Sequence, residues 1–188
     1  MLFIFDMGGV VTTTSTAEIQ IAEFLDINLD DFKQLIKPYF SALTCGKIGQ
    51  KDFWNIISKK TGKKIETDLW NFFFHPQLIE GTVKIISELK KKHRVICGTN
   101  TIENHYLRHI ERGDYTIFDE TYCSHKLGVE KPDPNFWKYI LLSENEKPEN
   151  AIFIDDKVEN VKTAERLNIK AYLFTSATKL REEFKQYL

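Results

Sequence analysis

The chain has 188 residues, which suits either one large domain or a smaller core that carries an insertion. Hydrophobic residues make up 42% and charged residues 28%, proportions that argue against an intrinsically disordered, collagen-like or coiled-coil chain. With 26 Lys and Arg against 27 Asp and Glu, the net charge of -1 argues against binding nucleic acid through a basic surface.

Four short apolar runs have the length of buried strands, and a weaker candidate lies between the second and third of them. In chain order these segments are Leu2–Phe5, Arg94–Gly98, the weaker Phe118–Cys123, Ala151–Ile154 and Lys170–Phe174. Helical patterns separate the runs, as they do in parallel βαβ units. We therefore predict an α/β fold built on a Rossmann-like parallel sheet.

The helices of this core are indicated by apolar spacing and by capping residues. Apolar side chains recur at helical spacing over residues 83–89, and Asp133 followed by Pro134 is typical of an N-cap and a first helical position. A further helix is predicted to begin near residue 158 and to end near Asn168. The apolar residues of a last predicted helix are Leu180, Phe184 and Tyr187.

Between residues 14 and 75 the pattern changes to helices alone, with no strand signal. The segment interrupts the connection after the first strand and is too long for a loop within a compact domain. We therefore predict a small helical cap over residues 14–75, inserted into a core formed by residues 1–13 and 76–188. Within the cap, the aromatic run Phe72–Phe74 is interpreted as packing rather than as function.

Cysteine usage and hydropathy indicate the compartment. Cys45, Cys97 and Cys123 are widely spaced and form no CxxC pair, so neither a disulfide framework nor a cysteine zinc site is expected, which favours a reducing cytoplasm. The first apolar run stops at Asp6 with no basic segment before it, so we predict no signal peptide. No apolar run approaches the ~20 residues that span a bilayer. We expect a cytoplasmic monomer or homodimer that binds neither nucleic acid nor membranes.

Polar side chains follow the predicted strands at the edge where parallel strands end. Open α/β sheets bind their ligands at this edge. Asp6 follows the first strand and precedes two glycines, which allow a tight turn that exposes backbone groups. The remaining residues of this predicted rim are Thr99, Asn100, Ser124, Lys131, Asp155 and Asp156.

This set of side chains has a chemical logic. Clustered carboxylates repel one another unless a cation lies between them, and their hard oxygen atoms suit Mg²⁺. A metal, the ammonium of Lys131 and a hydroxyl would neutralise a phosphoryl group, which leaves one carboxylate free to attack phosphorus. Each element alone is more often a cap, turn or surface residue, so the prediction depends on their order and spacing.

Four segments of the chain, taken together, resemble the four motifs of the haloacid dehalogenase superfamily. They are FDMGGV at 5–10, CGTNT at 97–101, LGVEKPDP at 127–134 and IFIDDKVENVKTAERLNI at 152–169. The resemblance covers nearly the whole chain and is strongest to the capped phosphatase branch of the superfamily. The segment GKIGQKDFW at 46–54 is similar to cap sequences of that branch. Within that branch the motifs look closest to alpha-D-glucose-1-phosphate phosphatase-like proteins.

The resemblance implies a Mg²⁺-dependent phosphatase that acts on a small phosphorylated metabolite, with a sugar phosphate as one candidate. Asp6 matches the nucleophile that becomes an aspartyl phosphate and also binds the metal. Thr99 and Lys131 match the residues that hold the phosphoryl group. Asn100 is expected beside the substrate.

The resemblance also implies a metal site and one missing group. Asp6 and Asp156 match metal ligands, Asp155 supports Asp156 or shares its role, and a further ligand is the carbonyl oxygen of Gly8. Most phosphatases of the family carry at this position a second Asp, which protonates the leaving group and later activates water. Such help is worth about 10² to 10⁴ in rate, so Gly8 predicts reduced turnover of poor leaving groups. Asn160 is a second mismatch, because many relatives place an acid there.

Two other functions stay open. A non-catalytic phosphate-binding or regulatory protein would explain Gly8 as a mark of lost turnover. A 2-haloacid dehalogenase uses the same nucleophile without a metal, but an enzyme that attacks a carboxylate-bearing substrate would avoid the extra charge of Asp155 and Asp156. His105 and His109 have helical metal-ligand spacing, yet we interpret them as a surface pair because Tyr106 lies where a zinc protease needs Glu.

Overall fold

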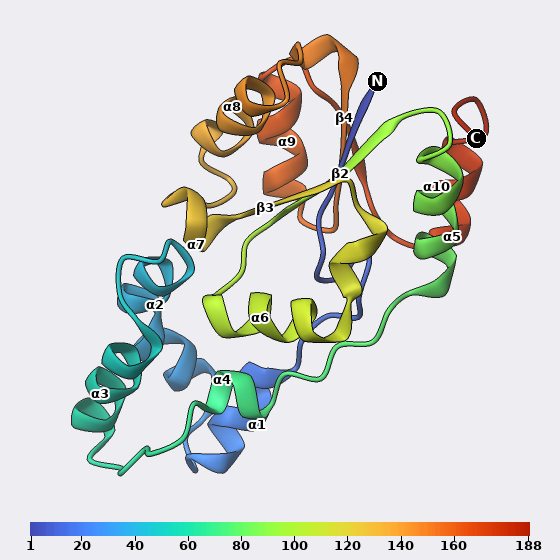
Figure 1. Cartoon of the computed structure of the whole chain (residues 1–188). Helices are drawn as coiled ribbons and strands as arrows, with labels where there is room; N and C mark the ends of the chain where they lie inside the picture. Colours follow the sequence, from blue (N-terminus) through green and yellow to red (C-terminus); the bar gives the residue numbers. More distant parts are fainter.

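Five parallel strands form one sheet, in the order β3-β2-β1-β4-β5, in the computed structural model, which describes residues 1–188 (Figure 1). The strands are β1 (Leu2–Phe5), β2 (Arg94–Thr99), β3 (Glu120–Cys123), β4 (Ala151–Asp155) and β5 (Lys170–Leu173). The predicted α/β fold is confirmed, and the weaker strand candidate is a real but shorter strand at one edge of the sheet.

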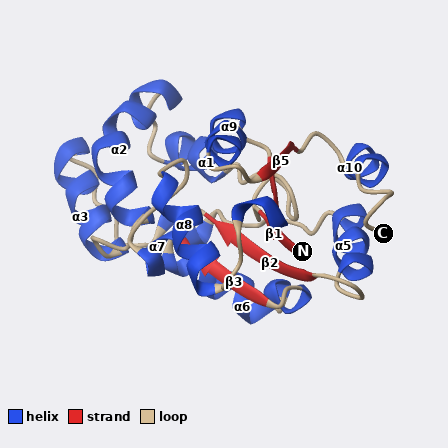
Figure 2. Cartoon of the chain, turned by 90° about the horizontal axis from the view of Figure 1, so that it is seen from above, coloured by secondary structure: helices blue, strands red, loops and turns tan.

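Helices cover both faces of the sheet (Figures 1 and 2). The core helices are α5 (Glu80–Leu89), α6 (Glu103–Arg112), α7 (Ser124–Leu127), α8 (Pro134–Ser143), α9 (Val158–Arg166) and α10 (Ala177–Glu183), with 3-10 turns η1 (Asp114–Ile117) and η2 (Pro148–Asn150). Asp133 caps α8 as predicted, since its side chain accepts a hydrogen bond from the Asn135 amide at 2.8 Å. Because α10 ends at Glu183, Phe184 and Tyr187 follow the last helix instead of lying in it.

Alternating side chains of β1 and β4 supply two hydrophobic clusters, one on each face of the sheet. Phe3 and Phe5 pack in the cluster with α5, η1 and α10, whereas Ile4 and Phe153 pack in the cluster with α8 and α9. Both strands are buried along their whole length, as expected for a parallel sheet that is covered on two sides. The buried strands provide a rigid support for the residues that follow them.

Residues 17–72 form helices only, which Figure 1 shows as a group beside the core. These helices are α1 (Ala17–Phe24), α2 (Leu29–Thr44), α3 (Gln50–Thr61) and α4 (Leu69–Phe72). They enclose a hydrophobic cluster of their own around Phe32, Phe53 and Trp70. Ile102, the N-cap residue of α6, also belongs to this cluster. The boundaries 14–75 stay a proposal, which this separate cluster supports.

The two chain segments that join these helices to the core lie side by side. The Thr13 amide donates to the Gln77 carbonyl at 2.8 Å, and Thr12 forms an antiparallel bridge with Leu78. Of the aromatic run, Phe74 is buried but Phe72 is 57% exposed, so the packing interpretation holds for only part of it. None of the helices combines the length and the apolar composition that crossing a membrane requires.

Candidate active site

The ends of β1 and β4 place two acids side by side at the centre of the sheet. Phe5 is in register with Ile154, and the Asp6 amide donates to the Ile154 carbonyl at 2.9 Å. Asp6 and Asp155 therefore leave neighbouring strands at the same level. β2 and β3 lie on one side of β1, and β4 and β5 lie on the other. The gap between β1 and β4 is therefore the topological switch point, where such sheets bind ligands.

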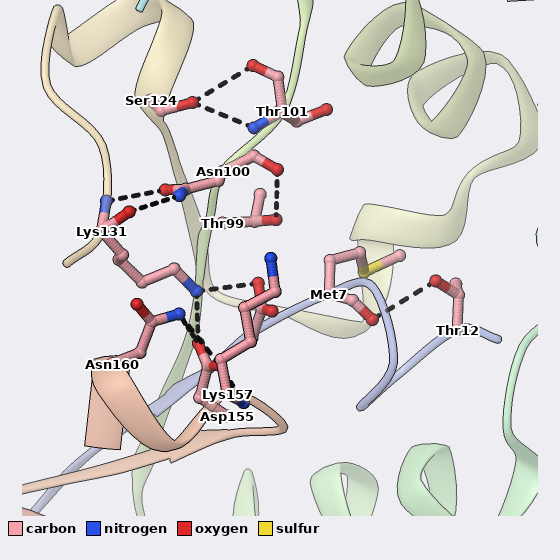
Figure 3. A network of polar contacts seen from close by, with 11 residues as sticks. Met7, Thr12, Thr99, Asn100, Thr101, Ser124, Lys131, Asp155, Lys157 and Asn160 are labelled. Atoms are coloured by element: carbon pink, nitrogen blue, oxygen red, sulfur yellow. Dashed lines mark hydrogen bonds and ion pairs between the residues drawn. The ribbon is translucent and has the colours of Figure 1, made fainter. Parts of the chain in front are cut away.

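Lys131 reaches these two acids from the loop before α8, and Figure 3 shows its side chain directed at Asp155. Its Nζ lies 2.9 Å from Asp6 Oδ1 and 2.6 Å from Asp155 Oδ2. All three residues are buried, with Lys131 only 3% exposed. Burial lowers the pKa of Lys131, but the charges of Asp6 and Asp155 outweigh this effect and raise it, so the ammonium keeps its proton.

Burial also acts on Asp6. It raises the pKa of the Asp6 carboxyl to about 6, with the charge of Asp155 adding to the rise and that of Lys131 opposing it. The single ammonium therefore does not offset the desolvation of the acids around it. An additional cation beside Asp6 would restore the ionised form that a nucleophile needs.

Asp155 has all of its hydrogen-bonding capacity satisfied by protein groups. Besides Lys131, the side-chain amide of Asn160 donates to both carboxylate oxygens at 3.0 Å, and the Lys157 backbone amide donates to Oδ1 at 2.8 Å. Asn160 is 2% exposed and lies in the first turns of α9. An acid at this position, which the family resemblance implies, would repel Asp155, whereas the amide of Asn160 is complementary to the carboxylate.

Asp156 is the opposite case, because its Oδ1 is enclosed and has no hydrogen-bond partner. Burial and the neighbouring charge of Asp155 raise the pKa of Asp156. Oxygen atoms of Asp6, Asp155 and Asp156 lie within 4.8 Å of one another. An all-oxygen group with an enclosed, unpartnered carboxylate atom fits a hard divalent cation such as Mg²⁺.

Gly9 makes room for Asp156. A Cβ added at Gly9 would lie 2.3 Å from Asp156 Oδ2, and the residue has a φ of +83°, in the left-handed region. Glycine is therefore required here by both contact and conformation. At Gly8, in contrast, an added Cβ would have no heavy atom within 4 Å.

The second strand contributes a hydroxyl and an amide. Thr99 is 3% exposed at the end of β2. The neighbouring Asn100 side chain forms two hydrogen bonds with the backbone of Lys131 (Figure 3). Asn100 Nδ2 donates to the Lys131 carbonyl, and the Lys131 backbone N–H donates to Asn100 Oδ1, each at 2.8 Å. Asn100 therefore positions the Lys131 loop. It also lines the cavity beside Gly8, and its place beside the substrate stays a prediction.

Ser124, which we also expected at the rim, links the cap to the core. Its hydroxyl donates to the Thr44 carbonyl of α2 at 2.7 Å and accepts from the Thr101 amide at 2.9 Å. The Thr44 hydroxyl in turn donates to Glu130, next to Lys131. Ser124 is therefore committed to holding α2 against the strand ends.

The two helical histidines are not a surface pair, which corrects our expectation. His109 is 3% exposed and its Nδ1 lies 2.7 Å from Asp114 Oδ2. His105 is half-buried, stacks on Phe74 with ring centroids 3.7 Å apart, and donates from Nε2 to the Trp70 carbonyl at 3.1 Å. Both were misjudged because α6 has few apolar residues, and the segment that covers it comes from residues 70–74, far away in the sequence.

A cavity of about 140 Å³ lies between the Asp6 loop, the Thr99 loop and α6. Its walls include Gly8 and Thr99 as well as His105, His109 and Tyr115. The Tyr115 hydroxyl is enclosed and has no hydrogen-bond partner. Sequence patterns gave no signal for Tyr115, since nothing in its neighbourhood marks it as part of a site.

Three comparisons with known proteins agree with this arrangement. A family model described as haloacid dehalogenase-like hydrolase matches residues 1–168. The chain is 25% identical over 190 residues to a sesquiterpene phosphatase of Aspergillus oryzae, covering 97% of this chain and 94% of that protein. It is 21% identical over 197 residues to a D-ribitol-5-phosphate phosphatase of Bacteroides thetaiotaomicron, covering 96% and 94% respectively.

A shorter match reaches 36% identity over 61 residues of a drimenol cyclase from Aspergillus calidoustus, which is 32% of this chain and 12% of that much longer protein. Among solved structures, the magnesium complex of an enzyme from Bacteroides thetaiotaomicron superposes with a TM-score of 0.82 at 24% identity, over 97% of both chains. At this identity the superposition shows a shared fold.

Proposed function

Because the chain belongs to the haloacid dehalogenase-like hydrolase family, we propose that it is a Mg²⁺-dependent phosphatase of a small phosphorylated metabolite, with Asp6 as nucleophile. One observation carries the proposal: Lys131 lies between Asp6 and Asp155, while the enclosed Oδ1 of Asp156 lacks a partner. This arrangement supplies a nucleophile, a phosphate-binding cation and an incomplete cation site at one point.

The side chains of Asp6 and Asp156 and the carbonyl of Gly8 would hold the metal. Asp155 belongs to the same carboxylate group, but its hydrogen bonds make it a support for Lys131 and for the loop that carries Asp156. When bound, Mg²⁺ supplies positive charge that offsets the charge of the phosphoryl oxygens.

The remaining steps use groups of the chain itself. Thr99 and the ammonium of Lys131 bind the phosphoryl oxygens, and Asn100 keeps Lys131 in place. Asp6 attacks phosphorus, the bond to the leaving oxygen breaks, and water then hydrolyses the aspartyl phosphate. Because Lys131 contacts Asp6 at 2.9 Å before substrate arrives, it is placed to contact a phosphoryl group on that carboxylate.

The size of the cavity beside Gly8 favours a small polar leaving group. It has a volume of about 140 Å³ and its walls carry the hydroxyls of Thr12, Thr13 and Ser15. We infer that a sugar or polyol phosphate is the substrate class. The two relatives that match along nearly their whole length, a sesquiterpene phosphatase and a D-ribitol-5-phosphate phosphatase, define the range of substrates to test. The resemblance to glucose-1-phosphate phosphatase-like proteins stays a prediction.

Two alternatives remain as outcomes of the same test. A non-catalytic phosphate-binding protein is favoured by Gly8, which has no side chain to move a proton. A 2-haloacid dehalogenase is disfavoured by the three carboxylates within 4.8 Å, which would repel a carboxylate-bearing substrate.

Phosphate release from a panel of phosphorylated sugars, polyols and prenyl alcohols tests the proposal, with Mg²⁺ and with EDTA. Wild type is compared with Asp6→Asn and Asp156→Asn, and Mg²⁺ binding is measured by calorimetry. We expect release that requires both acids and the metal. Tight Mg²⁺-dependent phosphate binding without release from any substrate would support the non-catalytic alternative, and halide release that persists in EDTA would support the dehalogenase.

A further inference from the structure

The departure of an alcohol from phosphorus requires a proton, and the groups around Asp6 do not supply one. Lys131 is held by two carboxylates, Asp155 accepts hydrogen bonds at both oxygens, and Gly8 has no side chain. General acid catalysis of such a step is worth about 10² to 10⁴ in rate. If the proposed function holds, the proton carrier must therefore come from the cavity beside Gly8.

Three side chains of that cavity carry a titratable group: His105, His109 and Tyr115. Burial raises the pKa of Tyr115 well above its usual value, so its hydroxyl is a poor acid. Burial lowers the pKa of His105 to about 4, and its Nε2 is committed to the Trp70 carbonyl. No carboxylate hydrogen-bonds to His105, and the charge of Asp68 does not offset the effect of burial.

His109 differs from both because a carboxylate holds its ring. Nδ1 donates to Asp114 Oδ2 at 2.7 Å, which leaves Nε2 as the titrating atom. A buried carboxylate behind an imidazole fixes the tautomer and stabilises the imidazolium when it forms. The ring lines the same cavity as Gly8 and Thr99.

We propose that His109 is the proton carrier of this active site and that Asp114 is its positioning residue. Protonated His109 gives its Nε2 proton to the leaving oxygen as Asp6 attacks phosphorus and the bond from phosphorus to that oxygen breaks. The electron pair of the broken bond stays on the leaving oxygen, which departs as the alcohol. Water then attacks the aspartyl phosphate and gives a proton to neutral Nε2, so phosphate leaves and both Asp6 and His109 return to their starting states.

The charged and titratable groups around His109 set the strength of this acid. Asp114 raises its pKa, whereas burial and Arg112 lower it, and burial is the largest effect. Arg112 Nε lies 3.0 Å from Asp114 Oδ2, so it shares the carboxylate with the imidazole. The other facing groups are His105 on the same helix and Tyr115 on η1, while the Phe74 ring covers the remaining side.

The leaving group of the substrate provides the test. p-Nitrophenolate is stable enough to leave as an anion, whereas an alkoxide must be protonated as it leaves. We therefore measure kcat/KM with p-nitrophenyl phosphate and with the best sugar or polyol phosphate. His109→Asn is the informative variant, because its amide nitrogen replaces Nδ1 and keeps the hydrogen bond to Asp114. We expect kcat/KM for the alkyl substrate to fall by about 100-fold, and for the aryl substrate by less than 3-fold.

Matched variants in the same cavity separate this role from packing. His105→Asn and Tyr115→Phe should affect the two substrates equally. Asp114→Asn should move the pH at which alkyl kcat/KM declines to a lower value, because the carboxylate raises the pKa of His109. Adding Gly8→Asp to His109→Asn should restore the alkyl rate, since it places an acid at the open position beside the same cavity.

Equal losses on both substrates, or no loss on either, would overturn the proposal for His109. If His109→Asn fails to fold, an unchanged alkyl pH profile in Asp114→Asn would overturn it instead. Failure of the proposed function itself looks different, because wild type would then release phosphate from neither substrate in an Asp6-dependent way.

Discussion

Asn160 donates its side-chain amide to both carboxylate oxygens of Asp155, at 3.0 Å each. Both residues are buried, and the same carboxylate also accepts from Lys131 and from the Lys157 backbone. Asn160, at a position where the family resemblance implies an acid, thus completes the hydrogen bonding of Asp155. Asp155 therefore has a supporting role, whereas the unpartnered Oδ1 of Asp156 stays free for a cation.

This pairing predicts the effect of restoring the acid. Asn160→Asp would place a second carboxylate against Asp155 in a buried position, so we expect the free energy of unfolding to fall by about 3 kcal/mol at neutral pH. Denaturant unfolding measures the change, with Glu159→Gln on the exposed face of α9 as the control. Unchanged stability of Asn160→Asp would mean that a cation or a proton compensates the new charge.

Gly9 predicts a coupling between backbone conformation and metal binding. Gly9→Ala would force the Asp156 carboxylate away from an added Cβ at 2.3 Å, so we expect weaker Mg²⁺ binding by at least about 10-fold, measured by calorimetry. Gly62→Ala is the matched control, because Gly62 has a φ of +68° but no neighbour within 4 Å. Equal Mg²⁺ affinity in the two variants would contradict the contact.

Gly8 predicts a gain of function. An aspartate fits there without a clash, since nothing lies within 4 Å of an added Cβ. We expect Gly8→Asp to raise kcat/KM for substrates with poor leaving groups by about 10-fold or more, and for p-nitrophenyl phosphate much less. Steady-state kinetics on both substrates measure the ratio, and equal acceleration would show that proton donation does not limit the wild-type rate.

His105 predicts a contribution to the pH dependence of stability. Its pKa falls from 6.5 to about 4 on folding. Between these pH values the unfolded chain binds more protons than the folded chain, so the folded state loses stability as pH falls. From pH 8 to pH 5 the loss is about 2 kcal/mol. Unfolding of wild type and of His105→Gln at both pH values measures it, and the variant should show the smaller decrease. An equal decrease in both proteins would contradict the burial of His105 against Phe74.

Local patterns in the sequence determined the strands, the helical insertion and the residues that end each strand. Four short apolar runs, separated by helical patterns, sufficed to predict a parallel sheet, because its central strands are buried on both faces and are therefore apolar. The order of Asp6, Thr99, Lys131 and the Asp155–Asp156 pair then indicated one rim, since parallel strands end at the same edge. Nothing beyond chain order and side-chain chemistry was needed for these conclusions.

Tertiary structure decided what each of those residues does. The carboxylates of Asp155 and Asp156 are adjacent in sequence, yet one is fully hydrogen-bonded and the other keeps an enclosed free oxygen. The partners that cause this difference come from α9 and from the loops that carry Lys131 and Gly9. Likewise, His109 became a cavity residue because segments distant in sequence cover α6. Burial and partner geometry depend on which elements meet in space, which the spacing of residues along one chain does not contain.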